Sequence, residues 1–460
     1  MHQRSEAKPR QAFCGFFFCA FTCLRSFSET GKQTTETRGK FHMGRIFPLF
    51  LAALFCISLP GSVIALSLML DTRVDPDFFP KQPRDLPQTT ERTLMGSLVA
   101  IRDQRLDVAL RQVESLIATH PEFRLAQLVY GDLLLSKTRS ITDVGAYPLD
   151  APSDKVIGLR EEARQRFRHH LYSPDPTALP EYLIHAPQDP AQVVVVDIGR
   201  SRLYLYQNRG GSLRLLGDYY ASIGKNGFPK RAKGDKKTPI GVYTTTGSIP
   251  ADTLPDLYGI GAFPINYPNE WDRQFGRTGN GIWIHGVPKD TYSRTPRSSD
   301  GCIAIANEDL RTIKDILATP NMPVILAQEV SWIQRKEIVA RRNRFEKQFH
   351  RWRRDWESLD HPSYARHYSS DFRNETEDRA SWLDYKQRIN AKKRYLRVGI
   401  SNLSIFAYPG EHNILVVTFE QDYRSDNFND HNKKRQYWRL EKDHRSQKDA
   451  WRIVYENTFS

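Results

Sequence analysis

The sequence is poor in cysteine, and the few cysteines are unevenly placed. Five occur in 460 residues, and after residue 56 only Cys302 remains. That later part of the chain has no internal pair for a disulfide. Paired cysteines with the spacing of zinc ligands are absent, as is the His-Glu-x-x-His motif of metalloproteases. The sequence therefore predicts no metal and no other cofactor, and it leaves one isolated thiol to be explained.

A long hydrophobic run is also missing. The longest early apolar stretch, residues 46–59, has 14 residues, whereas a membrane-spanning helix needs about 20. It follows Arg45 and is followed by small residues up to Ala65, a pattern typical of a secretory signal peptide over residues 43–65. An uncleaved amino-terminal anchor is the alternative. Residues 1–42 are then interpreted as a misassigned extension, and the protein is expected to be exported to the periplasm or cell envelope.

After residue 65, nearly all of the net basic charge lies in the C-terminal part of the chain. Lys and Arg number 67 against 53 Asp and Glu, but residues 66–334 are nearly balanced, while residues 335–460 hold 27 basic and 19 acidic side chains. Basic and acidic residues are interleaved there, and no zinc-finger, homeodomain or RNP pattern occurs. We therefore expect no nucleic-acid partner. A solvated basic face, or attraction to an anionic envelope polymer or glycan, is the preferred interpretation.

The segment before the middle of the chain has a helical pattern. Residues 66–92 are rich in Pro and Asp and are interpreted as a linker, and residues 93–185 as a helical N-terminal region. Apolar residues at helical spacing from Leu94 to Lys137, broken at Pro121, predict two helices. A single helical hairpin is too short for a solenoid. We expect it to pack on the next domain, or on a second copy of itself in a homodimer.

The sequence pattern of residues 190–330 is one of short β-strands. The pattern of residues 335–460 is a mixture of helices and strands, typical of an α+β domain. The fold class predicted is therefore a multidomain chain with a helical N-terminal region, a mostly-β domain and an α+β C-terminal domain. Strands are expected at 193–197, 203–206, 219–223, 241–246, 281–285 and 323–327, with a helix starting at Asn307. In the last domain, aromatic residues at helical spacing are interpreted as core and not as pocket lining; they include Trp352, Trp356, Tyr364 and Tyr368.

Two short motifs carry the candidate chemistry. The first is Gly281-Ile-Trp-Ile-His285-Gly286, and the second is Ser299-Asp-Gly301-Cys302, whose cysteine comes sixteen residues after Gly286. Acyl transfer by a cysteine needs a neighbouring imidazole to take the thiol proton and later return it. A glycine before the cysteine lets backbone N–H groups approach a developing oxyanion. The bland alternative is an inert buried thiol with an unrelated histidine.

From about Gln192 to Ala327 the sequence resembles the YkuD-type L,D-transpeptidase catalytic domain. The resemblance includes Val-Val-Asp-Ile-Gly with Leu-Tyr-Leu-Tyr, the phrase Lys237-Thr-Pro-Ile-Gly241, and His-Gly followed by Ser-x-Gly-Cys. The resemblance implies that Cys302 is the nucleophile and His285 its base, oriented by the Gly286 carbonyl. It also implies an oxyanion hole from the amides of Gly301 and Cys302. The substrate implied is the peptidoglycan stem peptide, cleaved before its terminal D-Ala.

This chain departs from the family pattern beside the cysteine. Many members have His before the Gly-Cys pair and Arg two residues after Cys, where this chain has Asp300 and Ala304. The missing arginine raises the question of what holds the donor's carboxylate. Candidate substrate-binding residues are Ser299, Asp300, Arg277 and Arg297, and Arg273 and Arg294 lie in the same loops.

The motifs also resemble one branch of the family, in which a nuclear transport factor 2-like domain follows the catalytic domain. Some members of that branch are L,D-carboxypeptidases that affect cell shape. Transpeptidase and carboxypeptidase share the acyl-enzyme and differ in whether an amine or water accepts the acyl group, so the motifs leave both open. A non-catalytic cell-wall-binding scaffold is the alternative from another class.

Overall fold

The computed structural model describes residues 89–138, 144–145, 153–411, 413–442 and 448–459. All of them belong to one compact unit, Gly61–Ser460. The predicted extension, the signal peptide and residues 66–88 of the predicted linker lie outside the described residues. Helix α1 begins at Thr89, so the last four residues assigned to that linker are helical. Within the described part of the chain, no helix is long and apolar enough to cross a membrane.

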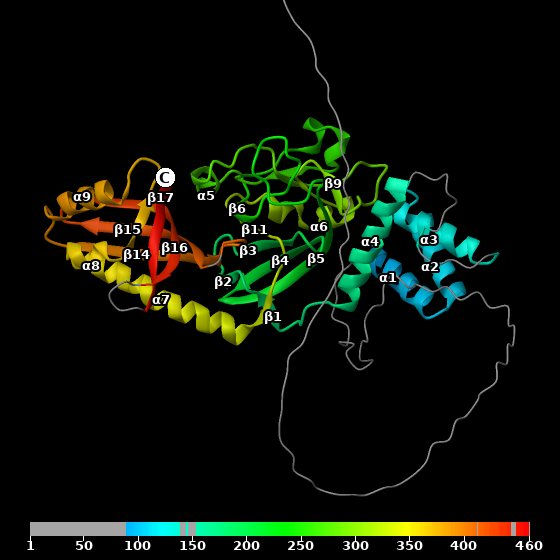
Figure 1. The fold of residues 1–460 in the computed structure, drawn as a ribbon, viewed down its shortest axis with the longest axis horizontal. Coiled ribbons are helices and arrows are strands. Elements are labelled where there is room, and N and C mark those ends of the chain that lie inside the picture. The colour runs from blue at the N-terminus through cyan, green and yellow to red at the C-terminus, as the bar shows by residue number, and fades with distance from the viewer. Residues whose placement is uncertain (1–88, 139–143, 146–152, 412, 443–447, 460) are drawn as a thin grey trace, which may run out of the picture. The chain divides into compact units, whose positions relative to one another are not determined.

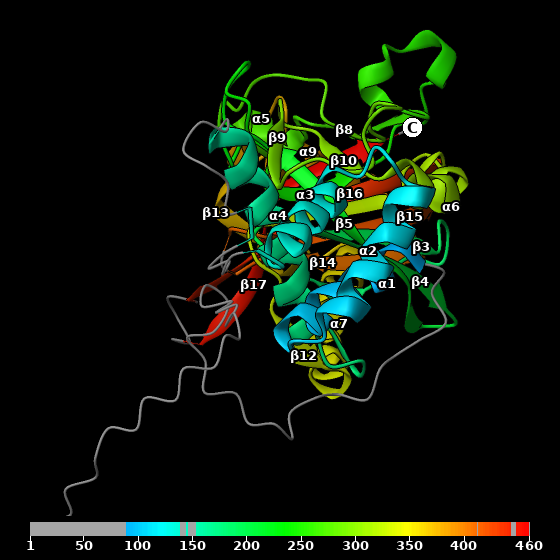
Figure 2. The same ribbon diagram turned by 90° about the vertical axis from the view of Figure 1, so that its right-hand side faces the viewer.

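The N-terminal region contains more helices than the apolar pattern predicted. Its helices are α1 (Thr89–Arg102), α2 (Leu106–Thr119), α3 (Arg124–Leu135) and α4 (Ser153–Leu171), grouped together in Figure 2. The prediction of two helices around Pro121 is wrong, because a tight turn also separates α1 from α2. Gln104 has φ +58° in that turn, and the Arg105 N–H donates to the Ala100 carbonyl at 2.8 Å. The apolar spacing runs on across this turn, so the pattern did not reveal it.

The middle of the chain forms a nine-stranded mixed sheet. The order is β6-β11-β3-β4-β5-β10-β8-β7, with β9 paired to β5. The predicted hairpin is confirmed as β3 and β4, an antiparallel pair. The strands are β3 (Gln192–Asp197), β4 (Arg202–Arg209), β5 (Ser212–Gly224), β6 (Gly241–Thr244), β7 (Ala262–Pro264), β8 (Trp283–His285), β9 (Arg297–Ser299), β10 (Ile303–Ile305) and β11 (Pro323–Ala327).

Two helices of this domain matter for the site. Helix α5 (Glu270–Gln274) lies in the long connection between β7 and β8, and α6 (Asn307–Leu317) follows β10. The apolar face predicted for α6 is buried through Leu310, Ile313 and Leu317. Strands β8 and β10 are parallel and adjacent, with Ile303 paired to Ile284.

The C-terminal region is a curved six-stranded sheet with a long helix packed against it (Figure 1). The buried aromatic side chains predicted as core are core, since Trp352, Trp356, Tyr364 and Tyr368 are each at most 2% exposed. The elements are β12 (Trp332–Gln334), α7 (Arg335–Glu357), α8 (His361–Ala365), β13 (Tyr368–Arg373), α9 (Arg379–Asn390), β14 (Leu396–Ala407), β15 (Ile414–Ser425), β16 (Asn429–Lys442) and β17 (Asp449–Phe459).

Two short strands join the first part of the chain to the last. β1 (Ala178–Pro180) pairs with β12, and β2 (Leu183–His185) pairs with β14 at the edge of the C-terminal sheet. The prediction that this stretch belongs to a helical region is wrong. Three-residue strands carry no readable periodicity, and their partners lie more than 150 residues away in the sequence.

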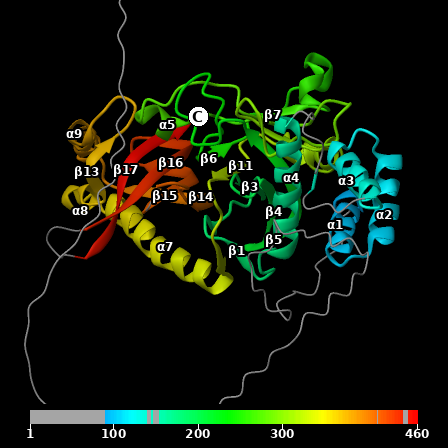
Figure 3. The ribbon, with the colours of Figure 1, turned by 45° about the vertical axis from the view of Figure 1, so that its right-hand side comes forward.

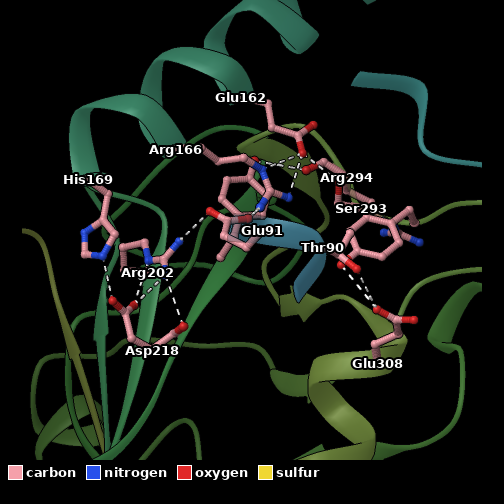
Figure 4. A network of polar contacts seen from close by, with 12 residues as sticks. Thr90, Glu91, Glu162, Arg166, His169, Arg202, Asp218, Ser293, Arg294 and Glu308 are labelled. Atoms are coloured by element: carbon pink, nitrogen blue, oxygen red, sulfur yellow. Dashed lines mark hydrogen bonds and ion pairs between the residues drawn. The ribbon is translucent and has the colours of Figure 1, made fainter. Parts of the chain in front are cut away.

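The helical region packs on the domain of the nine-stranded sheet. This is one of the two arrangements expected from the sequence, the other being packing on a second copy of the chain. Helix α4 lies beside β4 and β5 in Figure 3, and Figure 4 shows the polar network between them. Arg166 on α4 is 3% exposed; it donates to Glu162 at 2.9 and 3.0 Å and pairs with Glu91 of α1. Arg202 of β4 lies 2.7 Å from Asp218 and 3.5 Å from Glu91, so α1, α4 and the sheet share one set of charges.

Replacing Arg166 with Met is expected to destabilise the protein by about 3–5 kcal/mol, since it leaves the buried carboxylate of Glu162 without its cation. The measurement is the free energy of unfolding from urea titration followed by circular dichroism. The matched control is Arg388→Met on α9. Arg388 pairs with Asp384 through side chains that are 68% and 66% exposed. The control should change stability by no more than about 0.5 kcal/mol. Equal effects of the two substitutions would contradict the prediction.

Candidate active site

The turn before β10 is fixed by a side chain within it. The Ser299 hydroxyl donates to the Cys302 carbonyl at 2.7 Å and accepts the Gly301 N–H at 3.1 Å. Ser299 is 3% exposed. Its predicted role in substrate binding stays a prediction, since the hydroxyl hydrogen and one lone pair are already used inside the turn before Cys302.

The same hydrogen bond bears on the predicted oxyanion hole. The Gly301 N–H was expected to point at the oxyanion, but it donates to Ser299 Oγ instead. The Cys302 N–H has no acceptor among the described residues. In this structure the backbone N–H of Cys302 is available at the turn. The backbone N–H of Gly301 is hydrogen-bonded to Ser299 and would have to leave that bond to contact an oxyanion.

Gly301 is required by the backbone itself. Its φ is +126°, and a Cβ at this position would lie 2.7 Å from the Lys237 carbonyl oxygen. The contact with residues 237–241 explains why that motif accompanies the cysteine. Thr238 is fully buried, and its hydroxyl donates to the Gly301 carbonyl at 3.1 Å and accepts the Gly224 N–H at 2.9 Å. The sequence motif included Thr238 but did not show that its side chain anchors the turn before Cys302.

His285 ends strand β8 with its ring buried. Its Nδ1 lies 2.6 Å from the Gly286 carbonyl oxygen. A carbonyl only accepts, so Nδ1 carries the proton and Nε2 is left as an acceptor. Burial lowers the pKa of His285 to about 4, with the Gly286 hydrogen bond acting in the other direction. The imidazole is therefore neutral near pH 7, and the ring of Tyr258 packs edge-on against it at a centroid distance of 5.0 Å.

Cys302 lies directly before β10, which runs parallel to β8. Ile303 faces Ile284 and Ala304 faces His285, so Cys302 comes two residues before the residue that faces His285. The Cys302 thiol donates to the Gly281 carbonyl at 3.3 Å. Burial raises the pKa of Cys302 to about 11, while the charge of Arg294 acts to lower it. At rest the pair is a neutral thiol and a neutral imidazole, and ionisation of the thiol requires proton transfer.

A second unforeseen residue holds the chain after His285. The Asn307 side chain accepts the Val287 N–H at 3.2 Å and donates to the Val287 carbonyl at 2.8 Å. Asn307 was predicted only as a polar helix start. It is the first residue of α6, preceded by Ala306 as the flanking residue, and its amide pins the backbone that follows Gly286. An asparagine at a helix start gives no sequence signal for this tertiary role.

The C-terminal domain holds the loop that enters β8. Glu270 accepts from Arg435 and from the Tyr437 hydroxyl, both at 3.0 Å. Trp271 stacks on Tyr437 with ring centroids 4.8 Å apart. This loop ends at Gly281, whose carbonyl accepts the Cys302 thiol, so the accessory domain supports one wall of the site.

The predicted substrate-binding role of Arg277 stays a prediction, and its guanidinium already has two acidic neighbours. Its guanidinium donates to the buried Asp272 at 2.9 Å and lies 3.6 Å from Glu411. Asp300 and Arg297 are exposed, and Asp300 pairs with Lys225 at 2.7 Å; their roles stay predictions. In the part of the chain that the structure describes, no group of three His, Cys, Asp or Glu side chains is arranged to hold a metal ion.

Two regions of the chain match models of known protein families. Residues 191–326 match the L,D-transpeptidase catalytic domain, YkuD. This part of the chain is a YkuD-type L,D-transpeptidase domain. Residues 344–457 match the Cds6 C-terminal NTF2-like domain. The predicted family and the predicted fold class, with an L,D-transpeptidase domain between a helical region and an NTF2-like domain, are confirmed.

One curated relative is named as an L,D-transpeptidase, and two solved structures share the fold. YafK of Escherichia coli K12, named as an L,D-transpeptidase, is 34% identical over 113 residues, which is 24% of this chain. The match spans 41% of the relative's own length. Among solved structures, Bd1075 of Bdellovibrio bacteriovorus is 27% identical with a TM-score of 0.54, covering 61% of this chain and 98% of that one. The helical cell shape determining protein Pgp2 of Campylobacter jejuni shares the fold at 23% identity and TM-score 0.50, covering 62% and 96%.

Proposed function

We infer that this protein is a peptidoglycan L,D-transpeptidase of the cell envelope that acts through an acyl-enzyme at Cys302. The observation that carries this proposal is a buried imidazole at the end of β8 and a buried thiol directly before the parallel strand β10, with Nε2 of His285 left as an acceptor. The family of residues 191–326 supplies the substrate class, the peptidoglycan stem peptide.

The proposed first half-reaction keeps its protons in balance. His285 Nε2 takes the thiol proton as Sγ attacks the carbonyl before the terminal D-Ala, and the same proton then goes to the departing amine. The Gly286 carbonyl holds the ring and stabilises the transient imidazolium. The Cys302 N–H donates to the oxyanion, and the Gly301 N–H joins it once released from Ser299.

In the proposed second half-reaction an amine of another stem peptide attacks the thioester. His285 removes the proton of that amine and returns it to the departing Sγ. With water as acceptor, the same steps make a carboxypeptidase that trims tetrapeptides to tripeptides. Both outcomes begin with release of D-Ala, so one assay covers both.

The test is incubation of the purified protein with disaccharide tetrapeptides, followed by chromatography of the products and an assay for free D-Ala. D-Ala release with new dimers supports the transpeptidase. D-Ala release with tripeptides alone supports the carboxypeptidase in its place. No release of D-Ala overturns the proposed enzyme and favours the wall-binding scaffold. The polymer ligand of the C-terminal domain and the homodimer stay predictions.

Replacing Gly301 with Ala is expected to lower kcat/KM for D-Ala release by about 10²-fold, because shifting a reacting group by about 1 Å costs that much. The added Cβ would meet the Lys237 carbonyl oxygen at 2.7 Å, at a φ of +126° that side chains rarely adopt. The turn must therefore move, and Cys302 with it.

The matched control for Gly301 is Gly234→Ala. Gly234 also has a positive φ, +79°, but no atom lies within 4 Å of a Cβ built there. The control carries similar backbone strain at a distance from the turn, and its activity should stay within about 2-fold of the parent. A Gly301→Ala protein as active as the control would show that the turn tolerates the side chain.

A further inference from the structure

One arginine near the site has no acidic partner. Arg294 is half-buried, and its Nη2 donates to the Leu257 carbonyl at 2.9 Å. Among the described residues no carboxylate lies within ion-pair distance of it. A guanidinium has five N–H donors, so most of the hydrogen-bonding capacity of Arg294 is unused. Leu257 precedes Tyr258, whose ring packs on His285, and Arg294 is thereby tied to the wall of the site.

The backbone that carries Arg294 is fixed by the catalytic sheet. The Tyr220 hydroxyl on β5 donates to the Arg294 carbonyl at 3.0 Å. The neighbouring Ser222 hydroxyl donates to the Thr295 carbonyl at 2.6 Å. An arginine held at its own carbonyl and at its guanidinium loses little further freedom when it binds an anion.

The helical region fixes the same loop from the other side (Figure 4). The Ser293 hydroxyl donates to the buried carboxylate of Glu162 on α4 at 2.6 Å. Tyr292 packs against Phe123 with ring centroids 4.3 Å apart. The loop that bears Arg294 is therefore clamped between α4 and the sheet. This contact gives the helical region a role at the active site.

Three other cations around Cys302 already have acidic partners. Lys230 pairs with Asp235 at 2.7 Å, Lys225 pairs with Asp300 at 2.7 Å, and Arg277 pairs with Asp272. Position 304, where many family members have arginine, is an alanine that is 2% exposed between β5 and β8. Lys237 and Arg297 also lack an ion pair with a described carboxylate, but Arg297 is exposed and a lysine has no paired donor geometry. Arg294 is the half-buried guanidinium that is tied to the wall beside His285 through Leu257.

The proposed substrate presents the matching anion. A stem peptide that ends in D-Ala carries its terminal carboxylate one residue beyond the carbonyl that Cys302 attacks. A planar guanidinium binds a carboxylate through two parallel hydrogen bonds, which fixes both place and orientation. We propose that Arg294 binds the terminal carboxylate of the donor stem peptide and so aligns the preceding carbonyl with Cys302. This proposal rests on the proposed function.

The experiment compares two substrates in each protein: a tetrapeptide ending in D-Ala and the same peptide ending in D-Ala carboxamide. Both release a measurable amine, D-Ala or its amide, but only the first carries the carboxylate. With Arg294→Gln, kcat/KM for the carboxylate peptide should fall about 10- to 100-fold, mainly through a raised KM, while the carboxamide peptide changes less than about 3-fold. Arg294→Lys should be intermediate, because Lys keeps the charge and loses the paired geometry.

The design separates the proposal from folding defects and from the proposed function. A misfolded variant loses activity on both peptides equally. The ratio of the two kcat/KM values within one protein therefore removes the effect of misfolding. The control is Arg311→Gln on the exposed face of α6, which should leave both substrates unchanged. Equal losses on both substrates in Arg294→Gln overturn the role of Arg294. Absence of D-Ala release by the parent protein overturns the proposed function instead.

Discussion

Replacing Cys302 with Ala is expected to abolish D-Ala release, with a loss of about 10⁴-fold or more, because no other described side chain at the turn can form the acyl-enzyme. Cys302→Ser should be nearly as inactive. The resting thiol already has a pKa raised to about 11 by burial, and a hydroxyl at the same place is a far weaker acid. His285, with a pKa lowered to about 4, is too weak a base to activate it.

Two measurements check this expectation. The first is the rate of D-Ala release, and the second is the intact mass of the protein after mixing with a tetrapeptide, which should show a tripeptide adduct in the parent and none in Cys302→Ala. The Ser variant controls for packing, since it nearly keeps the shape of the side chain. Full activity of Cys302→Ala would show that the reaction does not pass through this thiol.

Replacing His285 with Gln is expected to lower kcat by about 10²–10⁴-fold, the usual contribution of a positioned general base. Glutamine is close in size and still hydrogen-bonds, but it accepts no proton at Nε2. The measurement is the rate of D-Ala release under saturating peptide. His431→Gln on β16 is the control, because this side chain is exposed and belongs to the other sheet.

The pH profile of the same proteins gives a second readout. The active resting form has a neutral imidazole and a neutral thiol. kcat/KM should therefore fall as pH drops through about 4, where His285 becomes protonated, and should fall again as pH rises through about 11, where Cys302 ionises. The acid limb should be missing in His285→Gln. A rise in kcat/KM as pH falls through 4 in the parent would contradict a neutral His285 as the base.

The sequence predicted those helices and strands that depend on the spacing of neighbouring apolar residues. The β3–β4 hairpin needs only alternating apolar residues around a turn, and α6 shows its buried face as a three- and four-residue spacing. The Cys302 turn was recognised from a short motif, and the structure places it directly before β10, which pairs with the strand that ends at His285. Each of these features depends on residues that are close to one another in the sequence.

The rest of the site depends on partners far apart in the chain. Thr238 reaches Gly301 across 63 residues, and Asn307 reaches Val287 across 20, so neither spacing suggests a contact. Ser299 and Arg277 were chosen for their chemistry, but the sequence does not show that Ser299 is bonded within its own turn and that Arg277 pairs with the buried Asp272. Sequence reasoning identifies which groups are reactive. Only tertiary structure shows which of them are still unpaired.

The attachment of both accessory regions to active-site loops changes where this protein can be divided. Trp271 lies on Tyr437 of the C-terminal sheet, and Ser293 is held by Glu162 of α4. β2, which precedes the catalytic sheet in sequence, completes the edge of the C-terminal one. A cut at residues 191 and 326 follows the family boundary and severs every one of these contacts. The flanking regions are parts of the active-site scaffold, and an exchange of either one between relatives would have to carry its matching loop with it.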